Sequence, residues 1–441
     1  MELPHFALPA CPDHLPERRR VLLGALAALA ALRSRGAGAA VPPDTLQVLH
    51  WWTSQGERAA AAALASRLAQ EHVTWRDAAV PGGAGQGALK VLKGRFLAGD
   101  APEATQIIGP AIAEWAGMGL LLELDDVAEA EGWDRALFPV VRELVRHRGH
   151  VVAAPLGIHR CNSLLVNRAV LARLGLAAPM SWPAFDQCLA RCAAAGVPAL
   201  VQSAEPWQVA TLFEALLLAS AGPALHRAIF SAHDEAALRD PRFALALSRL
   251  RACRRATASP GRELPWVDAV RELSEGRAAM MVTGDWGKAE LAQRGARAGA
   301  DFDCLPFPGT ADWHLYSIDT LVMIAGDFSH APAQRRLAAL CASPAMQEAW
   351  NRAKGSASVR RDADPARMDA AERASWTTFG RGPAALAPSM VHRMATDEAG
   401  RDAIIAELHR FDGDATLAPE ALAQRLGAIF RALARTPAAP E

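Results

Sequence analysis

The chain has 441 residues, of which 51% are hydrophobic and 21% are charged, so its composition is that of a folded protein with a sizeable core. Its 47 basic residues are balanced by 47 acidic residues, which argues against a nucleic-acid-binding protein and against a polybasic membrane-binding protein. At about 150 residues per domain, this length predicts two or three domains.

The first 39 residues have the pattern of a cleaved export signal. Arg18-Arg19-Arg20 precedes an apolar run of 12 residues, 21–32, which is too short to span a bilayer. The paired arginines also fit a twin-arginine signal, and Ala37-Gly38-Ala39 supplies the small residues of a cleavage site. The sequence therefore predicts a signal peptide at 1–39 and an exported mature chain. No uninterrupted apolar run reaches the roughly 18 residues of a membrane span, so stable membrane insertion is not expected.

Alternating strands and helices fill the first part of the mature chain, which indicates an α/β lobe. The predicted elements are a strand at 46–52, a helix at about 56–70, a strand near 78, a helix at 88–97, and strands at 104–108 and 151–156. Further along, the sequence predicts mostly helix over 167–257, strands at 278–283 and 316–324, and a helical tail from about 331 with a polar break at 354–365.

Motifs for cofactor binding and catalysis do not occur in the sequence. The Gly-rich turn at 81–87 has neither the dinucleotide-binding nor the P-loop spacing, so we interpret it as a flexible connection from strand to helix. A HExxH motif, a nucleophile elbow and a CxxC pair are also missing. We therefore expect no cofactor, no metal and no catalytic residue.

Aromatic and acidic residues gather where predicted strands end, and that edge of an α/β sheet is where ligands bind. Neighbouring strand residues point to opposite faces, so at most one of Trp51 and Trp52 should belong to the core. The other offers a flat apolar face for the C–H groups of a sugar ring, and the Glu57 carboxylate can accept hydrogen bonds from two hydroxyls. Further candidates of the same kinds are Asp285, Trp286, His159, Trp207, Asp319, Lys354 and His392. A single residue of these types after a strand is more often structural than functional.

The order of these motifs resembles that of the glucose/mannose-type periplasmic binding proteins of bacterial carbohydrate ABC transporters, in the extracellular solute-binding protein family 1. The matching segments cover nearly the whole mature chain. They are Leu49–Glu57, Thr74–Asp77, Val91–Lys93, Gln106-Ile107, Glu114–Ala116, Ile158–Arg160, Pro206–Gln208, Met281–Lys288, Pro306–Thr310, Ile318-Asp319, Lys354–Ser356 and Met390–Ala395.

This resemblance implies an α/β, two-lobed periplasmic-binding-protein fold of type II, with a crossover hinge and a ligand cleft between the lobes. The lobes would comprise 40–157 plus 314–360, and 158–313 plus 361–441. The resemblance also implies a non-catalytic, monomeric periplasmic protein that captures a mono- or small oligosaccharide and delivers it to the permease subunits of an ABC importer. Carried over by position, the sugar ligands would be Trp51, Trp52, Glu57, Lys354 and His392, with Asp285, Trp286, Asp319, His159 and Trp207 in second rank.

Three positions depart from the family pattern. In the family's Gln-Ile-Lys-Gly motif, this chain has Ile108 in place of the Lys that contacts sugar. The family has an aromatic residue after His-Arg-x-Asn, where this chain has Ser163. The family's His-Gly-Gly-Gln before Pro-Trp is replaced here by Gln202–Glu205. Losing a charged donor costs roughly 1.5–3 kcal/mol where its partner stays unpaired. The resemblance therefore implies a carbohydrate ligand without specifying glucose.

Two other functions stay open at this point. The first is a sugar sensor that docks to a chemoreceptor or kinase ectodomain. The second is an exported glycoside hydrolase that draws its two carboxyl groups from Glu57, Asp285 and Asp319. The hydrolase is the weaker alternative, because nothing in the sequence sets two of these carboxyl groups at a fixed separation.

Overall fold

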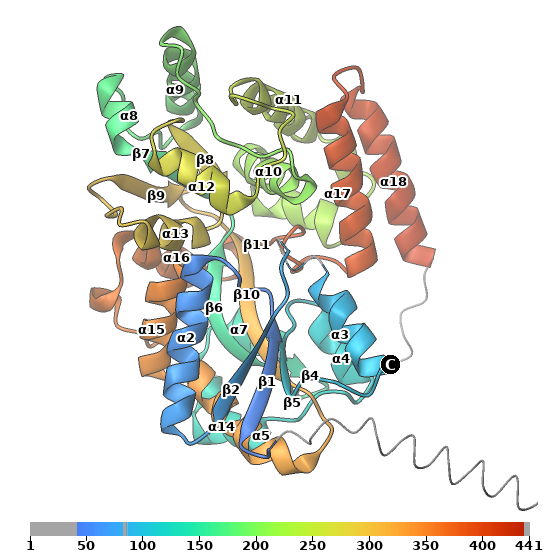
Figure 1. The fold of residues 1–441 in the computed structure, drawn as a ribbon. Helices are drawn as coiled ribbons and strands as arrows, with labels where there is room; N and C mark the ends of the chain where they lie inside the picture. Colours follow the sequence, from blue (N-terminus) through green and yellow to red (C-terminus); the bar gives the residue numbers. More distant parts are fainter. Residues whose placement is uncertain (1–41, 83–84, 86, 436–441) are drawn as a thin grey trace, which may run out of the picture. The chain divides into compact units, whose positions relative to one another are not determined.

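A computed structural model describes residues 42–82, 85 and 87–435 (Figure 1). The predicted signal peptide at 1–39 lies outside the described residues. Residues Pro43–Glu441 form one compact unit, and all of the structure discussed below belongs to it.

The larger sheet has six strands and contains the β-strands that open the mature chain. Strand β1 pairs in parallel with β2 and β3, whereas β10 runs antiparallel to β3 and to β6 and parallel to β11. The strand order is β11-β10-β3-β1-β2, with β6 attached to β10. These strands are β1 (Thr45–His50), β2 (Thr74–Ala79), β3 (Ala104–Gln106), β6 (Ala154–Arg160), β10 (His314–Met323) and β11 (Leu386–Pro388). The strands predicted at 46–52, 104–108 and 316–324 are among them.

Helix α2 (Gln55–Gln70) shows how the local sequence sets an element of this sheet layer. Ser54 accepts a hydrogen bond from the Glu57 N–H while the Glu57 side chain accepts one from the Ser54 N–H, which is a capping box. The buried positions Ala60, Ala61, Leu64 and Leu68 recur at helical spacing. Figure 1 shows α2 beside α15 (Pro344–Lys354), with α3 (Ala88–Leu97) and α4 (Ala111–Gly117) grouped elsewhere around the sheet.

The second sheet has three antiparallel strands in the order β8-β7-β9. Its strands are β7 (Ser163–Asn167), β8 (Met280–Thr283) and β9 (Phe302–Pro306). Only β8 was predicted, because the five-residue run of β7 is too short and too uniformly buried to show a period. The helices around this sheet are α8 (Arg168–Arg173), α9 (Trp182–Ala194), α10 (Pro206–Phe230), α11 (Pro241–Arg255), α12 (Trp266–Ser274), α13 (Trp286–Gln293), α17 (Glu398–Gly413) and α18 (Pro419–Arg435).

Two large hydrophobic clusters form around the two sheets. The first contains Trp52 and Ile158, and the second contains Leu164 and Phe213. The chain passes from the first cluster to the second after β6 and returns along β10. After residue 360 it contributes to both clusters, because Leu386 belongs to the first and Met390 to the second. We propose that the lobes follow the division 40–157 plus 314–360 and 158–313 plus 361–441, except that β11 belongs to the sheet of the first lobe.

Helix α10 is the one helix in the described part of the chain that is long and apolar enough to cross a membrane by composition. The sequence-based count of uninterrupted apolar residues missed it, because Glu214 and Thr211 interrupt the run. In the structure 78% of its apolar window is buried, as in the core helix of a globular protein. The helix is kinked at Gly222, where φ is 75°, next to Pro223.

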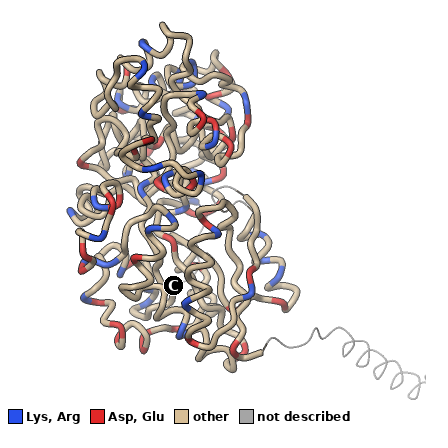
Figure 2. The backbone as a smooth tube through the Cα atoms, turned by 60° about the vertical axis from the view of Figure 1, so that its left-hand side comes forward, with Lys and Arg blue, Asp and Glu red and all other residues tan. Residues whose placement is uncertain are grey.

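Charged residues of both signs are interspersed along the chain. Figure 2 shows Lys and Arg (blue) and Asp and Glu (red) spread over the described backbone among the more numerous uncharged residues. The chain has 47 basic and 47 acidic residues, and those in its described part are therefore also mixed locally.

Candidate functional site

A cleft of about 480 Å³ is lined by residues from elements of both hydrophobic clusters. Segments that are far apart in sequence meet there, including the ends of β1, β6 and α15, the middle of β10, and the starts of α2, α10, α12 and α13. Eight of the ten predicted ligand residues line this cleft, and they are Trp51, Glu57, His159, Trp207, Trp286, Asp319, Lys354 and His392. The other two, Trp52 and Asp285, do not line it.

The two adjacent tryptophans have different surroundings. Trp51 is half-buried and lines the cleft, while Trp52 is fully buried in the first hydrophobic cluster. The Trp52 ring stacks on His50 at 4.7 Å between centroids and meets Trp350 edge-on at 4.8 Å. The expectation that at most one of the pair is a core residue is confirmed, and the core residue is Trp52.

Glu57 is fixed by its own helix and by a lysine from far along the chain. Its Oε2 accepts hydrogen bonds from the N–H groups of Thr53 and Ser54, at 3.0 and 3.1 Å. Its Oε1 accepts one from Lys354 Nζ at 3.0 Å. The capping box therefore also orients the carboxylate toward the cleft, which leaves an acceptor position on Oε1 for a ligand hydroxyl.

Lys354 is the last residue of α15, and Gly355 follows it in the left-handed conformation that ends the helix. Its Nζ lies 3.0 Å from Glu57 and 3.9 Å from Asp319. Burial alone would lower the pKa of this lysine, but the charges of Glu57 and Asp319 outweigh it and raise the pKa above its usual value. Lys354 is therefore a charged donor with two anionic partners.

His159 connects two buried carboxylates. Its Nδ1 lies 2.6 Å from Asp285 and its Nε2 lies 3.2 Å from Asp319. Burial favours the neutral ring, but the charge and hydrogen bond of Asp285, together with the bond to Asp319, raise the pKa of His159 to about 9. Both ring nitrogens then donate. Asp285 does not line the cleft itself, but it pairs with His159, which does.

Asp319 completes this group of charges. Its Oδ1 accepts a hydrogen bond from Gln106 Nε2 at 3.0 Å. Burial would raise the pKa of Asp319, but Lys354, His159 and Gln106 lower it below its usual value. The carboxylate therefore stays ionised, whereas a general acid in a glycosidase needs a raised pKa. This gives the hydrolase alternative no support at Asp319.

Aromatic rings also line the cleft next to these charged groups. Trp286 lies 5.4 Å from His159 and 4.9 Å from His392 between ring centroids, and Trp207 lies 6.0 Å from His392. Burial, followed by the charge of Arg401, lowers the pKa of His392 to about 3, so its ring is neutral. A cleft that combines flat apolar faces with fixed, ion-paired polar groups suits an uncharged, hydroxyl-rich ligand.

Several lining residues were not predicted from the sequence. They are Ile108, Glu205, Trp266, Glu290, Arg294 and Ser317, among others. Ile108 had been singled out only as a substitution, and the structure places its buried side chain in the cleft wall. Trp266 follows Pro265 at the start of a helix, and the unusual count of 12 tryptophans was the one signal that pointed toward it.

Two of the buried histidines, His159 and His392, predict losses of stability at alkaline and at acidic pH. His159 has a raised folded-state pKa, so its contribution is complete below about pH 6.5, where the unfolded histidine is also protonated, and is lost as pH rises toward 9. His392 has a lowered folded-state pKa, so its contribution is present above about pH 6.5 and is lost as pH falls toward 3. Urea unfolding of the unliganded protein from pH 4 to 9.5 should show both losses.

Variants separate the two limbs of this profile. His159→Gln should flatten the alkaline limb and leave the acidic limb. His392→Gln should reduce the acidic limb without removing it, because burial also lowers the pKa values of His50 and His314. An alkaline limb that is unchanged in His159→Gln would contradict the protonated bridge between Asp285 and Asp319.

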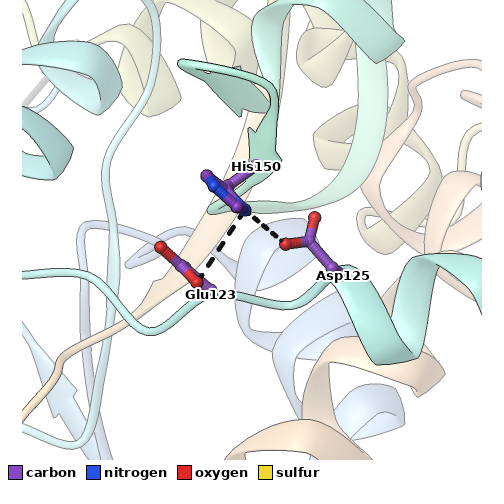
Figure 3. A group of neighbouring side chains, drawn as sticks. All are labelled: Glu123, Asp125 and His150. Carbon is purple, nitrogen blue, oxygen red and sulfur yellow. Dashed lines mark hydrogen bonds and ion pairs between the residues drawn. The ribbon is translucent and has the colours of Figure 1, made fainter.

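A separate polar cluster contains Glu123, Asp125 and His150 (Figure 3). His150 Nδ1 lies 2.7 Å from Asp125 and 3.8 Å from Glu123. The hydrogen bond to Asp125 and the charge of Glu123 raise the pKa of His150. All three side chains are exposed, none lines the cleft, and the histidine nitrogen nearest the acids already pairs with Asp125. The cluster has the features of a surface ion pair.

Comparisons with known proteins place the fold and the family. A model of the family described as bacterial extracellular solute-binding protein matches residues 86–376. A probable sugar-binding periplasmic protein of Brucella suis is 34% identical over 82% of this chain and 86% of its own length. One of Rhizobium meliloti is 33% identical over 89% of this chain and 95% of its own length.

Solved structures agree with this assignment at the level of the fold. The solute receptor AcbH, which prefers β-D-galactopyranose, has a TM-score of 0.75 at 18% identity and covers 89% of this chain and 98% of its own. A chitin oligosaccharide binding protein has a TM-score of 0.74 at 16% identity, with 90% and 99% covered. The fold is therefore the two-lobed fold of periplasmic binding proteins, as predicted, and the chain belongs to the bacterial extracellular solute-binding protein family.

Proposed function

We propose that this protein is a periplasmic carbohydrate receptor that captures a mono- or small oligosaccharide and delivers it to the permease subunits of an ABC importer. One observation carries the proposal. Eight side chains of the types that stack on sugar rings and bond to hydroxyls, from segments between residues 51 and 392, line a single cleft. The names of the Brucella and Rhizobium relatives support the same ligand class and the same location.

The side chains divide into two roles. Trp51 and Trp286 supply apolar faces for the C–H groups of a sugar ring. Glu57, Lys354 and Asp319 exchange hydrogen bonds with ring hydroxyls, and these bonds are strong because one partner is charged. Trp52 supports Trp51 from the core, and Asp285 holds His159. The protein acts as a monomer and performs no catalysis.

Closure around the ligand is the second part of the proposal. Gly56 N–H, at the start of α2, donates to Glu290 Oε2 on α13 at 3.2 Å. This bond joins a helix packed on the first cluster to a helix on the other wall of the cleft. A sugar that contacts both walls stabilises the closed arrangement, which is the form that a transporter can recognise.

A thermal-shift screen of the chain from Ala40 against about forty sugars and polyols tests the proposal. Binding to the native state alone raises stability by about 2.7 kcal/mol at a hundredfold excess over Kd, so a ligand should raise Tm by a few degrees. Failure of every sugar and polyol to raise Tm would contradict the carbohydrate assignment.

Trp51→Ala should weaken binding of the sugar found in that screen by about tenfold to a hundredfold, because the ring loses its stacking partner. Isothermal titration calorimetry measures the change. Trp75→Ala is the matched control, because Trp75 is also half-buried and packs on the first cluster but does not line the cleft. Equal loss of affinity in both variants would mean that the effect is structural.

A further inference from the structure

We infer that Thr211 is a positioning residue for His392: its hydroxyl keeps the ring proton on Nε2, so that Nδ1 faces the cleft as a hydrogen-bond acceptor. This inference rests on the proposed function, and it deepens that function by requiring a ligand hydroxyl that donates a hydrogen bond at this place.

The His392 ring carries a single proton, and either of its two nitrogens can hold it. Burial, followed by the charge of Arg401, lowers the pKa of His392 to about 3, so the ring is neutral. A neutral imidazole has one nitrogen that donates and one that accepts. The hydrogen bond of one nitrogen therefore decides what the other offers to a ligand.

Thr211 supplies that hydrogen bond, and its own hydrogen is already used. Its Oγ1 lies 2.8 Å from the Trp207 carbonyl oxygen, four residues earlier on α10, and 3.1 Å from His392 Nε2. A carbonyl oxygen only accepts, so at 2.8 Å the hydroxyl hydrogen lies between the two oxygens. A hydroxyl has one hydrogen, so Oγ1 meets the ring with a lone pair and Nε2–H donates to it.

The other ring nitrogen, Nδ1, opens to the cleft. It forms no hydrogen bond with the residues that the structure describes, and it is not one of their fully buried polar atoms without a partner. The Nδ1 atoms of His226, His314 and His330 are buried in that way. Nδ1 of His392 is therefore accessible, and the space that this residue lines is the cleft.

The backbone of His392 is fixed by the same helix. Glu214 accepts a hydrogen bond from Ser389 Oγ at 2.6 Å, and Ser389 Oγ accepts one from the His392 N–H at 3.1 Å. Trp207, Thr211 and Glu214 are separated by four and three residues, so they share one face of α10. This face therefore fixes the position of the ring as well as its proton.

An acceptor at His392 agrees with the other polar groups of the cleft. Glu57 and Asp319 line it with carboxylate oxygens, and Ile108 lines it where the family pattern has a charged donor. Both ring nitrogens of His159 already bond to carboxylates, so this histidine has no hydrogen left for a ligand. The cleft therefore selects ligands whose hydroxyls donate.

Long-range 1H–15N correlation NMR of the chain from Ala40, labelled with 15N-histidine, shows directly which nitrogen holds the proton. The resonances of His392 are identified by their loss in His392→Gln or by through-bond assignment. In the unliganded protein, Nε2 should be protonated and Nδ1 should not. The opposite arrangement would overturn the inference, and this measurement needs no sugar.

Isothermal titration calorimetry with D-glucose, D-galactose and D-xylose tests the effect on binding. Thr211→Val should bind the tightest of the three about tenfold more weakly than the unmodified chain, because either nitrogen can then hold the proton. Thr211→Ser keeps the hydroxyl and should restore both the affinity and the single protonation state.

Thr378→Val is the matched control. Thr378 lies on α16 (Ala370–Phe379), is buried, and its Oγ1 donates to the Ala374 carbonyl at the same distance of 2.8 Å, but it does not line the cleft. This variant should leave the protonation of His392 and the sugar affinity unchanged. If Thr211→Val does not fold, Thr211→Ala removes the same hydroxyl and supports the same comparison.

The outcomes distinguish this inference from the proposed function. Equal weakening in Thr211→Val and Thr378→Val, or no recovery in Thr211→Ser, would overturn the role of Thr211. A bound sugar that leaves the Nδ1 resonance of His392 unchanged would overturn the hydrogen bond to the ligand and leave the receptor function intact. If no sugar of the thermal-shift screen binds, the proposed function is wrong, and the NMR measurement still decides where the proton lies.

Discussion

Replacing Lys354 by Met should weaken sugar binding by about a hundredfold and also destabilise the unliganded protein. The lysine is 5% exposed and pairs with Glu57 and Asp319, so its loss leaves Glu57 without its charged donor and leaves Asp319 with His159 as its remaining cation. Removing one partner of a buried ion pair costs about 3–5 kcal/mol. Glu57 keeps its hydrogen bond from the Thr53 N–H, and Asp319 keeps its hydrogen bond from Gln106. The expected loss of stability therefore lies at the lower end of this range. Calorimetric titration and urea unfolding measure the two effects.

Lys288→Met is a matched control for this variant. Lys288 is equally buried and forms an ion pair of 2.6 Å with Asp369, but it does not line the cleft. The Lys288→Met variant should therefore be less stable than the unmodified protein but bind the sugar with the same affinity. If both lysine variants lose affinity alike, the effect of Lys354 is a general consequence of destabilisation and not of a contact with the ligand.

The helices and strands that carry strong local signals were predictable from the sequence. The helix at 88–97 was predicted with its observed bounds, because a Gly-rich turn precedes it and Gly99 follows it, and the structure places both Gly87 and Gly99 in the left-handed conformation. Strand β10 was predicted at 316–324, which is within two residues of its observed bounds, His314–Met323. By contrast, β7 and β9 were missed. Strand β7 lies between β8 and β9 and is buried throughout, so it shows no alternation of apolar and polar residues. Strand β9 is an edge strand of only five residues, too short to show a clear period.

The site was predictable where its residues follow strand ends and occur in recognisable motifs. Trp51 and Glu57 are of this kind, and the structure brings both to the cleft. What the sequence could not supply is which side chains are joined. The bonds from His159 to Asp285 and Asp319 connect residues that are 126 and 160 positions apart, and only the tertiary fold sets such distances. Trp266 was missed for the same reason, since its place in the cleft wall depends on where the tertiary fold puts the start of α12.

Gly109→Ala should destabilise the protein by about 2–4 kcal/mol and weaken sugar binding with it. Gly109 comes directly after Ile108 and has a left-handed conformation, with φ of 65°. A Cβ at this position would lie 1.7 Å from the carbonyl oxygen of Arg393 and 2.8 Å from its carbonyl carbon. Both are backbone atoms, so no change of rotamer relieves the overlap, and one of the two segments must move. Movement of Arg393 also displaces the adjacent His392, whose carbonyl accepts a hydrogen bond from Ser317 at 3.2 Å.

Gly119→Ala separates the conformational cost from the overlap. Gly119 has nearly the same φ, 71°, but a Cβ there meets nothing within 4 Å. This variant should lose only the cost of a left-handed non-glycine residue, about 1–2 kcal/mol, and should keep its sugar affinity. Urea unfolding and calorimetric titration of the two variants side by side give the comparison. Equal stabilities with unchanged affinity in both would mean that the segment at Arg393 moves without cost, and that its close approach to Gly109 does not maintain the shape of the cleft.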